Sequence, residues 1–398
     1  MIRVLCLSTL FPNVARPGFG RFVARQAEAL AARGDIDLTV INPIARAPWP
    51  LGVLLGNAAE RAVPEREVWH GVTVHRPRFV HIPQFGAPWN PGLIRRGVMP
   101  LAHRLHAEQP FDLVDAQFFY PDGPAAARIA RALGLPLSIK ARGSDIHYWG
   151  TRGFARRRML AAAEQAVGLL AVSEALKRDM IALGMPADRI AMHYTGLDHE
   201  LYRIEVHAAE TRDEFGFSRD SPLLASVGNL VPLKGHDLTI AAVARLPGVQ
   251  LAIAGQGPEL GALRALAARL GIGDRVKFLG DLGPEKVARL LQSADAMVLP
   301  SEREGLANVW IEALACGTPL VISDVGGARE IVRDASAGRL VERTPQAIAA
   351  GVNEVLSAAP SRAEVAAHAA RFSWDANAAQ LAEYYRRIVP TPSRASRS

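Results

Sequence analysis

PSEREGLANVWIEALACGTPLVISDVGG, which runs from Pro300 to Gly327, places Glu304 and Glu312 eight residues apart. The apolar residues of Met297–Pro300 are typical of a strand that is ending, and Leu306–Cys316 has the pattern of a helix closed by a glycine. A strand, a short loop and a helix in this order indicate an open α/β sheet. Such sheets bind ligands at the carboxyl ends of their strands, so this loop is a candidate binding site.

Glu304 and Gly305 fall in the loop, whereas Glu312 lies inside the helix, about 12 Å further along at ~1.5 Å per residue. The free N–H groups and the dipole of a helix N-terminus favour a phosphate group. Ionised carboxylates repel phosphate, but they accept hydrogen bonds from sugar hydroxyls. The spacing therefore fits a nucleotide-sugar that lies along the helix, although two glutamates on a surface helix indicate nothing by themselves.

Composition limits the classes of protein to consider. The chain has 398 residues, of which 49% are hydrophobic and 21% charged, as in a globular protein of two or three domains. Lys and Arg outnumber Asp and Glu by 46 to 39, and the net charge of +7 suits an anionic ligand or membrane face. Solvated helix faces explain the same excess equally well.

The two cysteines, Cys6 and Cys316, lie in apolar runs, so we expect buried thiols and a cytoplasmic protein. No run is long and apolar enough to span a bilayer. The opening residues Ile2–Leu7 are better explained as a first strand than as a signal peptide.

Short apolar runs alternate with amphipathic helical patterns in two successive halves, which favours two α/β domains with parallel sheets. The predicted strands are Arg3–Ser8, Leu38–Ile41, Leu113–Ala116, Leu137–Lys140, Gly168–Val172, Leu223–Val227, Gln250–Ala254, Val276–Leu279, Ala296–Leu299 and Leu320–Ser323. The predicted helices include Gly20–Arg33, Ala125–Leu133, Leu238–Ala244 and Glu259–Leu270. TGLDHELYR, at residues 195–203, separates the halves.

Two segments of the first half, Asn42–Gly56 and Arg76–Met99, interrupt the alternation. Both are rich in Pro, Gly and Trp with Arg between them. We interpret them as long loops or irregular helices that carry binding, with packing over the sheet edge as the alternative. We expect the tail, residues 390–398, to be disordered.

The stretch quoted first resembles the signature of the retaining GT-B glycosyltransferases of family 4, PS..EG....LEA.A.G.P.V....GG, in which two glutamates have the same separation. The resemblance implies that Glu304 faces the donor sugar and that Glu312 holds the ribose hydroxyls. It also implies that the amides of Gly305 and Leu306 face the diphosphate.

Further motifs of the second half carry the same resemblance. SVGNLVPLKGHDLTIAA is similar to the opening of the family's second domain, and IAGQGPE and VKFLGDL match later segments. Asn229 stands where the family usually has arginine, so one fixed positive charge fewer faces the phosphates. The resemblance implies a donor-binding set that is completed by Gly228, Asn229, the diphosphate-binding Lys234, Gly255, and Phe278 and Leu279 beside the base.

In the first half, RPGFGRFVARQAEAL resembles the glycine loop after the first strand, where Gly18 and Gly20 let the backbone approach the donor phosphates. KARGSDIHYW resembles a segment that more often contains a histidine, here replaced by Arg142, and Asp145 matches its acid. Arg142 is a candidate for binding an anionic acceptor or the leaving diphosphate, and an ordinary ion pair with Asp145 is the equal alternative.

The resemblance implies two Rossmann-like α/β domains that face each other across a cleft, with a C-terminal helix crossing back to the first. The expected acceptor domain is 1–197 completed by helix 375–389, and the expected donor domain is 198–374. The candidate catalytic residues are Glu304, Lys234, Asp145 and Arg142. No metal or other cofactor is expected, because the histidines are scattered and Asp35-Ile36-Asp37 is better explained as a turn.

The implied function is retaining transfer of a sugar from a UDP- or GDP-sugar to a hydroxyl of a glycan or lipid-linked acceptor, in cell-surface or extracellular polysaccharide biosynthesis. An anionic membrane surface is a candidate partner of a cytoplasmic, peripheral enzyme, whereas no motif indicates nucleic acid. The candidate membrane contacts are Trp49, Leu54, Leu55, Trp89, Arg95 and Arg96. The alternatives are an epimerase or hydrolase on the same fold, and a non-catalytic nucleotide-sugar-binding protein.

Overall fold

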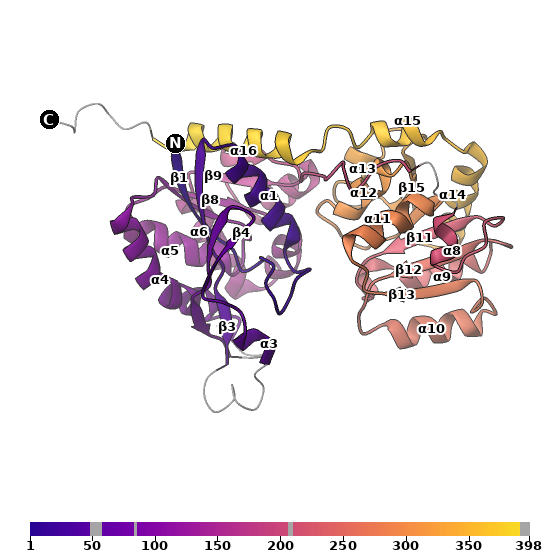
Figure 1. Cartoon of the computed structure of the whole chain (residues 1–398), viewed down its shortest axis with the longest axis horizontal. Helices are drawn as coiled ribbons and strands as arrows, with labels where there is room; N and C mark the ends of the chain where they lie inside the picture. The colour runs from indigo at the N-terminus through magenta and orange to yellow at the C-terminus, as the bar shows by residue number, and fades with distance from the viewer. Residues whose placement is uncertain (48–57, 83–85, 206–209, 391–398) are drawn as a thin grey trace. The chain divides into compact units, whose positions relative to one another are not determined.

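The computed structural model describes residues 1–47, 58–82, 86–205 and 210–390. The chain divides into two compact units (Figure 1): Met1–Gly196 with Trp374–Ser398 form the first, and Leu197–Ser373 the second. The predicted tail residues 391–398, and three of the predicted membrane contacts, Trp49, Leu54 and Leu55, lie outside the described residues.

The first unit is built on an eight-stranded sheet with the order β10-β9-β8-β7-β1-β2-β5-β4. Every neighbouring pair is parallel except β4 with β5, which is antiparallel. The strands are β1 (Ile2–Leu7), β2 (Ile36–Ile41), β4 (Arg66–Trp69), β5 (Val72–His75), β7 (Leu113–Ala116), β8 (Leu137–Lys140), β9 (Gly168–Ala171) and β10 (Ile190–Met192). The central strands β7, β8 and β9 are buried along their whole length, as expected for a sheet with helices on both faces.

The helices of the first unit include the last helix of the chain, α16, which packs against α1 (Figure 1). Leu381 and Tyr385 of α16 join the same apolar core as Val4 of β1 and Leu30 of α1. This confirms the predicted C-terminal helix that returns to the first domain. The helices are α1 (Arg21–Ala32), α3 (Ala58–Arg61), α4 (Asn90–Glu108), α5 (Asp122–Leu133), a π-helical turn (Asp145–Trp149), α6 (Gly153–Gln165), α7 (Glu174–Leu183), a 3-10 turn (Ala187–Arg189) and α16 (Trp374–Ile388).

The chain passes between the units after Gly196 and before Trp374, and these two residues lie together at the start of α16. A Cβ on Gly196 would come within 2.4 Å of the indole of Trp374, so only glycine fits against this ring. Asn377 of α16 donates from Nδ2 to the carbonyl of Tyr194 at 2.6 Å. The start of α16 is therefore fixed to the last residues of the first long segment.

The second unit has a six-stranded, fully parallel sheet with the order β13-β12-β11-β14-β15-β16. The strands are β11 (Leu223–Val227), β12 (Gln250–Ala254), β13 (Val276–Gly280), β14 (Ala296–Leu299), β15 (Leu320–Ser323) and β16 (Gly338–Val341). The helices are α8 (Thr211–Glu214), a 3-10 turn (Pro232–Lys234), α9 (His236–Val243), α10 (Leu260–Arg269), α11 (Pro284–Ser293), α12 (Asn308–Ala315), α13 (Ala328–Ile331), α14 (Pro345–Ala358) and α15 (Arg362–Ala367).

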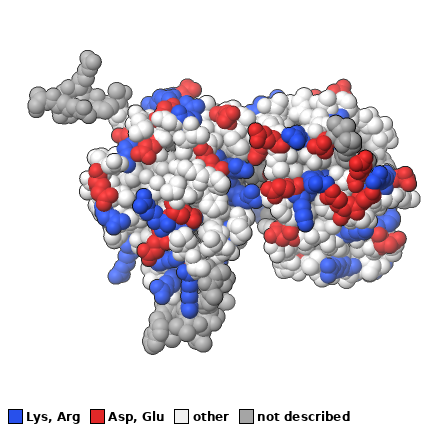
Figure 2. All heavy atoms as spheres, viewed as in Figure 1, with Lys and Arg blue, Asp and Glu red and all other residues white. Residues whose placement is uncertain are grey.

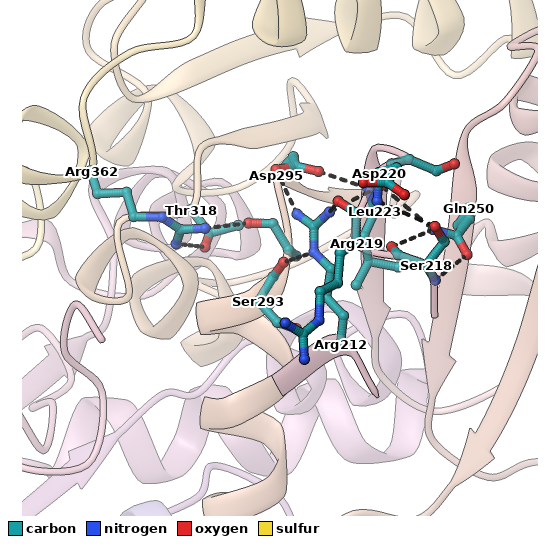
Figure 3. Close-up of polar contacts among 12 residues, drawn as sticks. Arg212, Ser218, Arg219, Asp220, Leu223, Gln250, Ser293, Asp295, Thr318 and Arg362 are labelled. Atoms are coloured by element: carbon teal, nitrogen blue, oxygen red, sulfur yellow. Dashed lines mark hydrogen bonds and ion pairs between the residues drawn. The ribbon is translucent and has the colours of Figure 1, made fainter. Parts of the chain in front are cut away.

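Two arginines form hydrogen bonds at the edge where the strands of this sheet begin (Figure 3). Arg212 pairs with Asp295 at 2.8 Å and donates from Nε to the carbonyl of Ser293 at 2.9 Å. Arg362 donates to the carbonyls of Cys316 and Ala294 at 3.1 and 3.0 Å, so it holds the end of α12. Guanidinium groups are favourable here because helix C-termini carry partial negative charge. The hollow of about 410 Å³ that these residues line is at the edge opposite to the one where such sheets bind ligands.

The segment Arg76–Met99, predicted to be a loop or irregular helix, contains regular structure. Strand β6 (Arg78–Val80) pairs with β3 (Ile44–Arg46) in a separate two-stranded sheet, and α4 begins at Asn90. Both cysteines are buried free thiols, as predicted. Among the described helices, none combines the length and apolar character needed to cross a membrane.

Candidate active site

The strand order of the second sheet reverses at β11, which lies between β12 and β14. The loops after β11 and β14 therefore leave the carboxyl edge side by side, at the point where open α/β sheets bind ligands. The first loop carries Gly228, Asn229 and Lys234, and the second carries Glu304 and Gly305. This arrangement brings together the two longest motifs that the sequence singles out.

Lys234 and Glu304 form an ion pair between these two loops, with Nζ 2.5 Å from Oε1. The two side chains are only 19% and 12% exposed. Lys234 ends the short 3-10 turn after β11, which directs its ammonium group toward the loop after β14. Because both charges are largely removed from water, loss of either partner leaves the other poorly compensated.

Two glycines allow the loops of this edge to pack backbone against backbone. A Cβ on Gly255, after β12, would lie 1.9 Å from the carbonyl oxygen of Gly228. A Cβ on Gly326, after β15, would lie 2.1 Å from the carbonyl oxygen of Glu304. Both glycines have positive φ, 144° and 52°. The position of Glu304 is thus set by main-chain contacts as well as by its ion pair with Lys234.

Helix α12 begins at Asn308, two residues after the predicted start, because Ala307 still has an extended conformation with ψ 121°. Gly305 and Leu306 therefore precede the first turn, and the carbonyl of Gly305 accepts a hydrogen bond from the N–H of Gly327 at 2.9 Å. Glu312 lies on α12 and is half-buried. Phe278 and Leu279 lie on the edge strand β13 and are also half-buried, which leaves part of each side chain accessible.

His236, which the sequence reasoning did not select, supports the loop that carries Asn229. Its Nδ1 lies 3.0 Å from the hydroxyl of Ser226, and its Nε2 lies 3.3 Å from the carbonyl of Asn229. Burial lowers the pKa of His236 to about 4, against the effect of hydrogen bonds to the carbonyls of Asn229 and Gly228, so the ring is neutral at pH 7. Its place directly after the Lys234-Gly235 pair was the signal that could have identified it.

The first sheet reverses its strand order between β1 and β7. A second polar cluster lies at the carboxyl ends of the strands of this sheet. The guanidinium of Arg142 donates from Nη2 to the side-chain oxygens of Gln117 and of Gln26, the latter at 3.3 Å. It also lies over the ring of Phe22, 4.9 Å from the centroid. Burial lowers the pKa of Arg142 to about 10, so it remains a cation at pH 7.

The predicted alternative for Arg142 is a side-chain ion pair with Asp145. The structure instead joins the two residues through the main chain of Arg142. The main-chain N–H of Arg142 donates to the carboxylate of Asp145 at 3.0 Å, while the guanidinium turns toward the two glutamines. Asp145 is fully buried and also accepts from the N–H groups of Phe119 and Gly143, both at 2.8 Å. Asp145 thus joins the loops after β7 and β8, which favours a structural role.

The structure separates the predicted residues into two sets. Arg142, Asp145, Gly18 and Gly20 belong to the first unit, and the other predicted site residues belong to the second. Gly20 caps α1 with φ 73° and packs against the backbone of Leu10, whereas nothing lies within 4 Å of a Cβ placed on Gly18.

No metal centre is visible in the described part of the chain, where no group of three or more His, Cys, Asp or Glu side chains could hold an ion. The Asp35-Ile36-Asp37 sequence was not predicted to bind a metal, and its two carboxylates form ion pairs. Asp35 pairs with Arg33 at 2.9 Å, and Asp37 pairs with Arg3 at 2.6 Å.

Two family models match the chain, one to each unit. The model for "Glycosyltransferase Family 4" matches residues 17–201, and the model for "Glycosyl transferases group 1" matches residues 208–372. Together they include all the predicted site residues.

Curated relatives include D-inositol 3-phosphate glycosyltransferases. That of Mycobacteroides abscessus is 41% identical over 212 residues, which are 50% of this chain and 47% of that protein. That of Mycolicibacterium smegmatis is 35% identical over 237 residues, 57% of this chain and 54% of that protein. The chain thus spans about half the length of the curated relatives it matches.

Solved structures match over nearly the whole chain. Sucrose-phosphate synthase from Thermosynechococcus elongatus has a TM-score of 0.77 at 21% identity, over 98% of this chain and 99% of that one. The Anabaena protein HepE, solved with UDP-glucose, has a TM-score of 0.74 at 21% identity, over 97% and 100%. The predicted GT-B fold is confirmed by these likenesses.

The family models match on both sides of the boundary between the units, and the fold is that of GT-B proteins over almost the full length. The chain therefore belongs to the family 4 glycosyltransferases, a family of retaining enzymes with the GT-B fold.

Proposed function

We propose that the chain transfers a sugar from a nucleoside-diphosphate-sugar to a hydroxyl of an acceptor, with retention of anomeric configuration. The observation that carries the proposal is the largely buried Lys234–Glu304 pair between the loops after β11 and β14. A cation at this edge suits the diphosphate, and a carboxylate beside it suits the hydroxyls of the sugar.

In this mechanism the bond between the anomeric carbon and the phosphate oxygen breaks while the acceptor oxygen bonds to the same face of the sugar. The acceptor's proton goes to the leaving phosphate. Lys234 and the amides of Gly305 and Leu306 stabilise the negative charge that develops on the diphosphate. Glu304 positions the sugar, Glu312 binds the ribose, and Arg142 binds an anionic group of the acceptor or of the leaving group.

The finer identity of the substrates is part of the proposal. HepE, solved with UDP-glucose, supports testing UDP-sugars before GDP-sugars. The D-inositol 3-phosphate glycosyltransferases support including phosphorylated acceptors. We propose a glycan or lipid-linked acceptor used in surface or extracellular polysaccharide assembly, with metal-independent transfer in the cytoplasm.

A membrane-associated acceptor is supported by the first unit. Trp89 is 57% exposed, and Arg95 and Arg96 are exposed on α4. On the face that Figure 2 draws, acidic and basic side chains are intermingled. Flotation with anionic vesicles tests this contact, and protein that stays at the bottom of the gradient would exclude it.

The function itself is tested with a donor panel. Purified protein is incubated with UDP- and GDP-sugars, with and without a membrane lipid extract and with and without EDTA, and released nucleotide is counted. Release that needs one donor and the extract, and that EDTA does not reduce, supports the proposal. Release without an acceptor supports an epimerase or hydrolase, whereas binding of a donor without turnover supports a non-catalytic protein.

A further inference from the structure

A lysine lies fully buried in the sheet of the first unit, two residues before Arg142. Lys140 is the last residue of β8 and has no exposed surface. Its Nζ lies 3.0 Å from Oε1 of Gln26 and 2.5 Å from Nδ1 of His193. The other ring nitrogen, Nε2 of His193, lies 2.9 Å from the carbonyl of Asn377 on α16. Because a carbonyl only accepts, Nε2 carries the proton and Nδ1 accepts from Lys140.

The same hydrogen-bond chain continues to Arg142. Oε1 of Gln26 accepts from Arg142 Nη2 at 3.3 Å as well as from Lys140. The amide nitrogen of Gln26 donates to Oε1 of Gln117 at 3.0 Å, and that oxygen also accepts from Nη2 of Arg142. Gln117 in turn donates to the buried carboxylate of Asp115. A continuous network thus extends from α16 through Lys140 to the guanidinium.

The network orients one side of the guanidinium and leaves the other side available. Nε and Nη2 of Arg142 bond to Gln117 and Gln26. In the part of the chain that the structure describes, Nη1 makes no hydrogen bond to another residue, and it is not fully buried. Its two N–H groups can therefore reach a ligand at the carboxyl edge of the sheet.

Stability alone does not account for Lys140. Removing an ammonium group from water costs several kcal/mol, and well-packed apolar residues in place of buried ionic groups are often neutral or stabilising. Burial and the neighbouring Arg142 both lower the pKa of Lys140, while Asp115 opposes them. The geometry offers a different reason for a donor at this place. Lys140 and Arg142 both require an acceptor from Gln26, so the lysine selects the orientation of this amide that also serves the arginine.

We propose that Lys140 is a positioning residue, which acts through Gln26 to direct the Arg142 guanidinium at an anionic group of the substrate. The proposal deepens the proposed function and rests on it, because that function assigns Arg142 to a ligand. Without Lys140, we expect the Gln26 amide to lose its preferred orientation and Nη2 of Arg142 to lose an acceptor.

The first test is structural and needs no substrate. Lys140→Met keeps the length and apolar volume of the side chain but removes its donors. We expect the variant to fold, and we expect its crystal structure to show a turned Gln26 amide and a displaced Arg142 guanidinium. A guanidinium that keeps its bonds to both glutamines would overturn the proposal. Gln26→Leu breaks the chain at the next link and serves if Lys140→Met does not fold.

The second test is a double-mutant cycle on transfer with the donor that the panel identifies. We expect Lys140→Met to lower kcat/KM about 10- to 100-fold, and to have no further effect when Arg142→Gln is already present. Additive losses would show that Lys140 does not act through Arg142.

Gln165→Met is the matched control for both tests. It keeps the length of the side chain and removes a partly buried donor, the one that bonds to the carbonyl of Ala127 at 2.6 Å, outside the chain to Arg142. We expect it to retain activity within about twofold. If the wild-type protein transfers with no donor, the proposed function fails, while the crystallographic comparison still decides whether Lys140 positions Arg142.

Discussion

At the scale of single residues, the ion pair between Lys234 and Glu304 joins charges that the proposed reaction uses in different ways. In our proposal, the lysine faces a diphosphate whose negative charge grows during transfer, whereas the carboxylate holds a neutral sugar. In the structure, the two side chains pair with each other. The pair therefore preorganises the site, and its two members should respond differently to substitution.

Glu304→Gln keeps the shape of the side chain and removes its charge. We expect kcat for transfer to fall by about 100-fold or more, because the sugar loses an acceptor that matters in the transition state. The affinity for the free nucleoside diphosphate should change by less than about threefold, since the side-chain oxygen of the glutamine can still accept a hydrogen bond from Lys234. Steady-state kinetics and calorimetric titration with the nucleotide measure the two quantities, and equal losses in both would remove the assigned role.

Lys234→Met should weaken nucleotide binding itself, by about tenfold or more, because charge-assisted contacts to phosphate are lost and Glu304 is left unpaired. Lys286→Met is the matched control, since Lys286 is exposed on α11 of the same unit. Titration of both variants with the nucleoside diphosphate gives the comparison. Similar affinities in the two variants would contradict the diphosphate contact.

Asp122, the first residue of α5, gives a pH-dependent prediction. It is fully buried, one carboxylate oxygen accepts from the N–H of Thr9 at 2.8 Å, and the other has no hydrogen-bond partner among the described residues. Burial raises its pKa from 3.8 to about 7. The unfolded carboxyl loses its proton near pH 4 and the folded one only near pH 7, so the stability from Asp122 declines as pH rises through this window.

Asp122→Asn should remove that decline, which between pH 5 and pH 8 is on the order of 3 kcal/mol, because ~1.4 kcal/mol is lost for each pH unit from pH 5 to the folded pKa. Denaturant unfolding of wild type and variant at pH 5 and pH 8 measures it. Asp188→Asn, at an exposed position of the same unit, is the control and should behave as wild type. Parallel pH profiles for wild type and Asp122→Asn would show that the buried carboxyl is not the cause.

At the scale of elements, the apolar runs predicted the strands well. β7, β8, β11, β12, β14 and β15 have the predicted bounds, because buried parallel strands need continuous apolar sequence and this pattern is local. The pattern could not find α4, since Pro91, Gly92, Gly97 and Pro100 are typical of loops. Gly97 is required by packing: a Cβ there would lie 2.7 Å from the carbonyl of Arg78 on β6, a contact that no local signal announces.

In the candidate site, too, some features could be predicted from the sequence and others could not. Glu304, Glu312 and Lys234 could be proposed from motif spacing, whereas the support of Asn229 by His236 and of Arg142 by Gln26 depends on residues far apart in the chain or buried beneath the loops. These supporting contacts arise from tertiary packing. Sequence periodicity does not report them.

The loop after β15 offers a prediction at this scale. Gly326→Ala would place a Cβ 2.1 Å from the carbonyl oxygen of Glu304, at a residue whose φ is already positive. We expect the loop to shift and kcat/KM to fall about 10- to 100-fold. Gly261→Ala, in open space on α10, should leave activity unchanged and raise stability slightly. Full activity of Gly326→Ala would show that the loop contact does not position Glu304.

At the scale of the whole molecule, each unit has its own sheet and its own apolar core. If the second unit binds the donor, a nucleoside diphosphate should stabilise that unit by about 2.7 kcal/mol at a concentration of 100 Kd. Calorimetry with and without nucleotide, combined with hydrogen exchange to assign the units, tests this. Stabilisation confined to the first unit would reverse the donor and acceptor assignments.

The position of α16 also determines the order in which the protein can be completed. During synthesis, the strands of the first unit leave the ribosome long before the helix whose Leu381 and Tyr385 belong to their core. The second unit is one continuous segment, so it can close as soon as it emerges. The first unit, although its strands are synthesised first, therefore cannot be completed until α16 is synthesised. The apolar surface that α16 covers stays exposed while the second unit is translated.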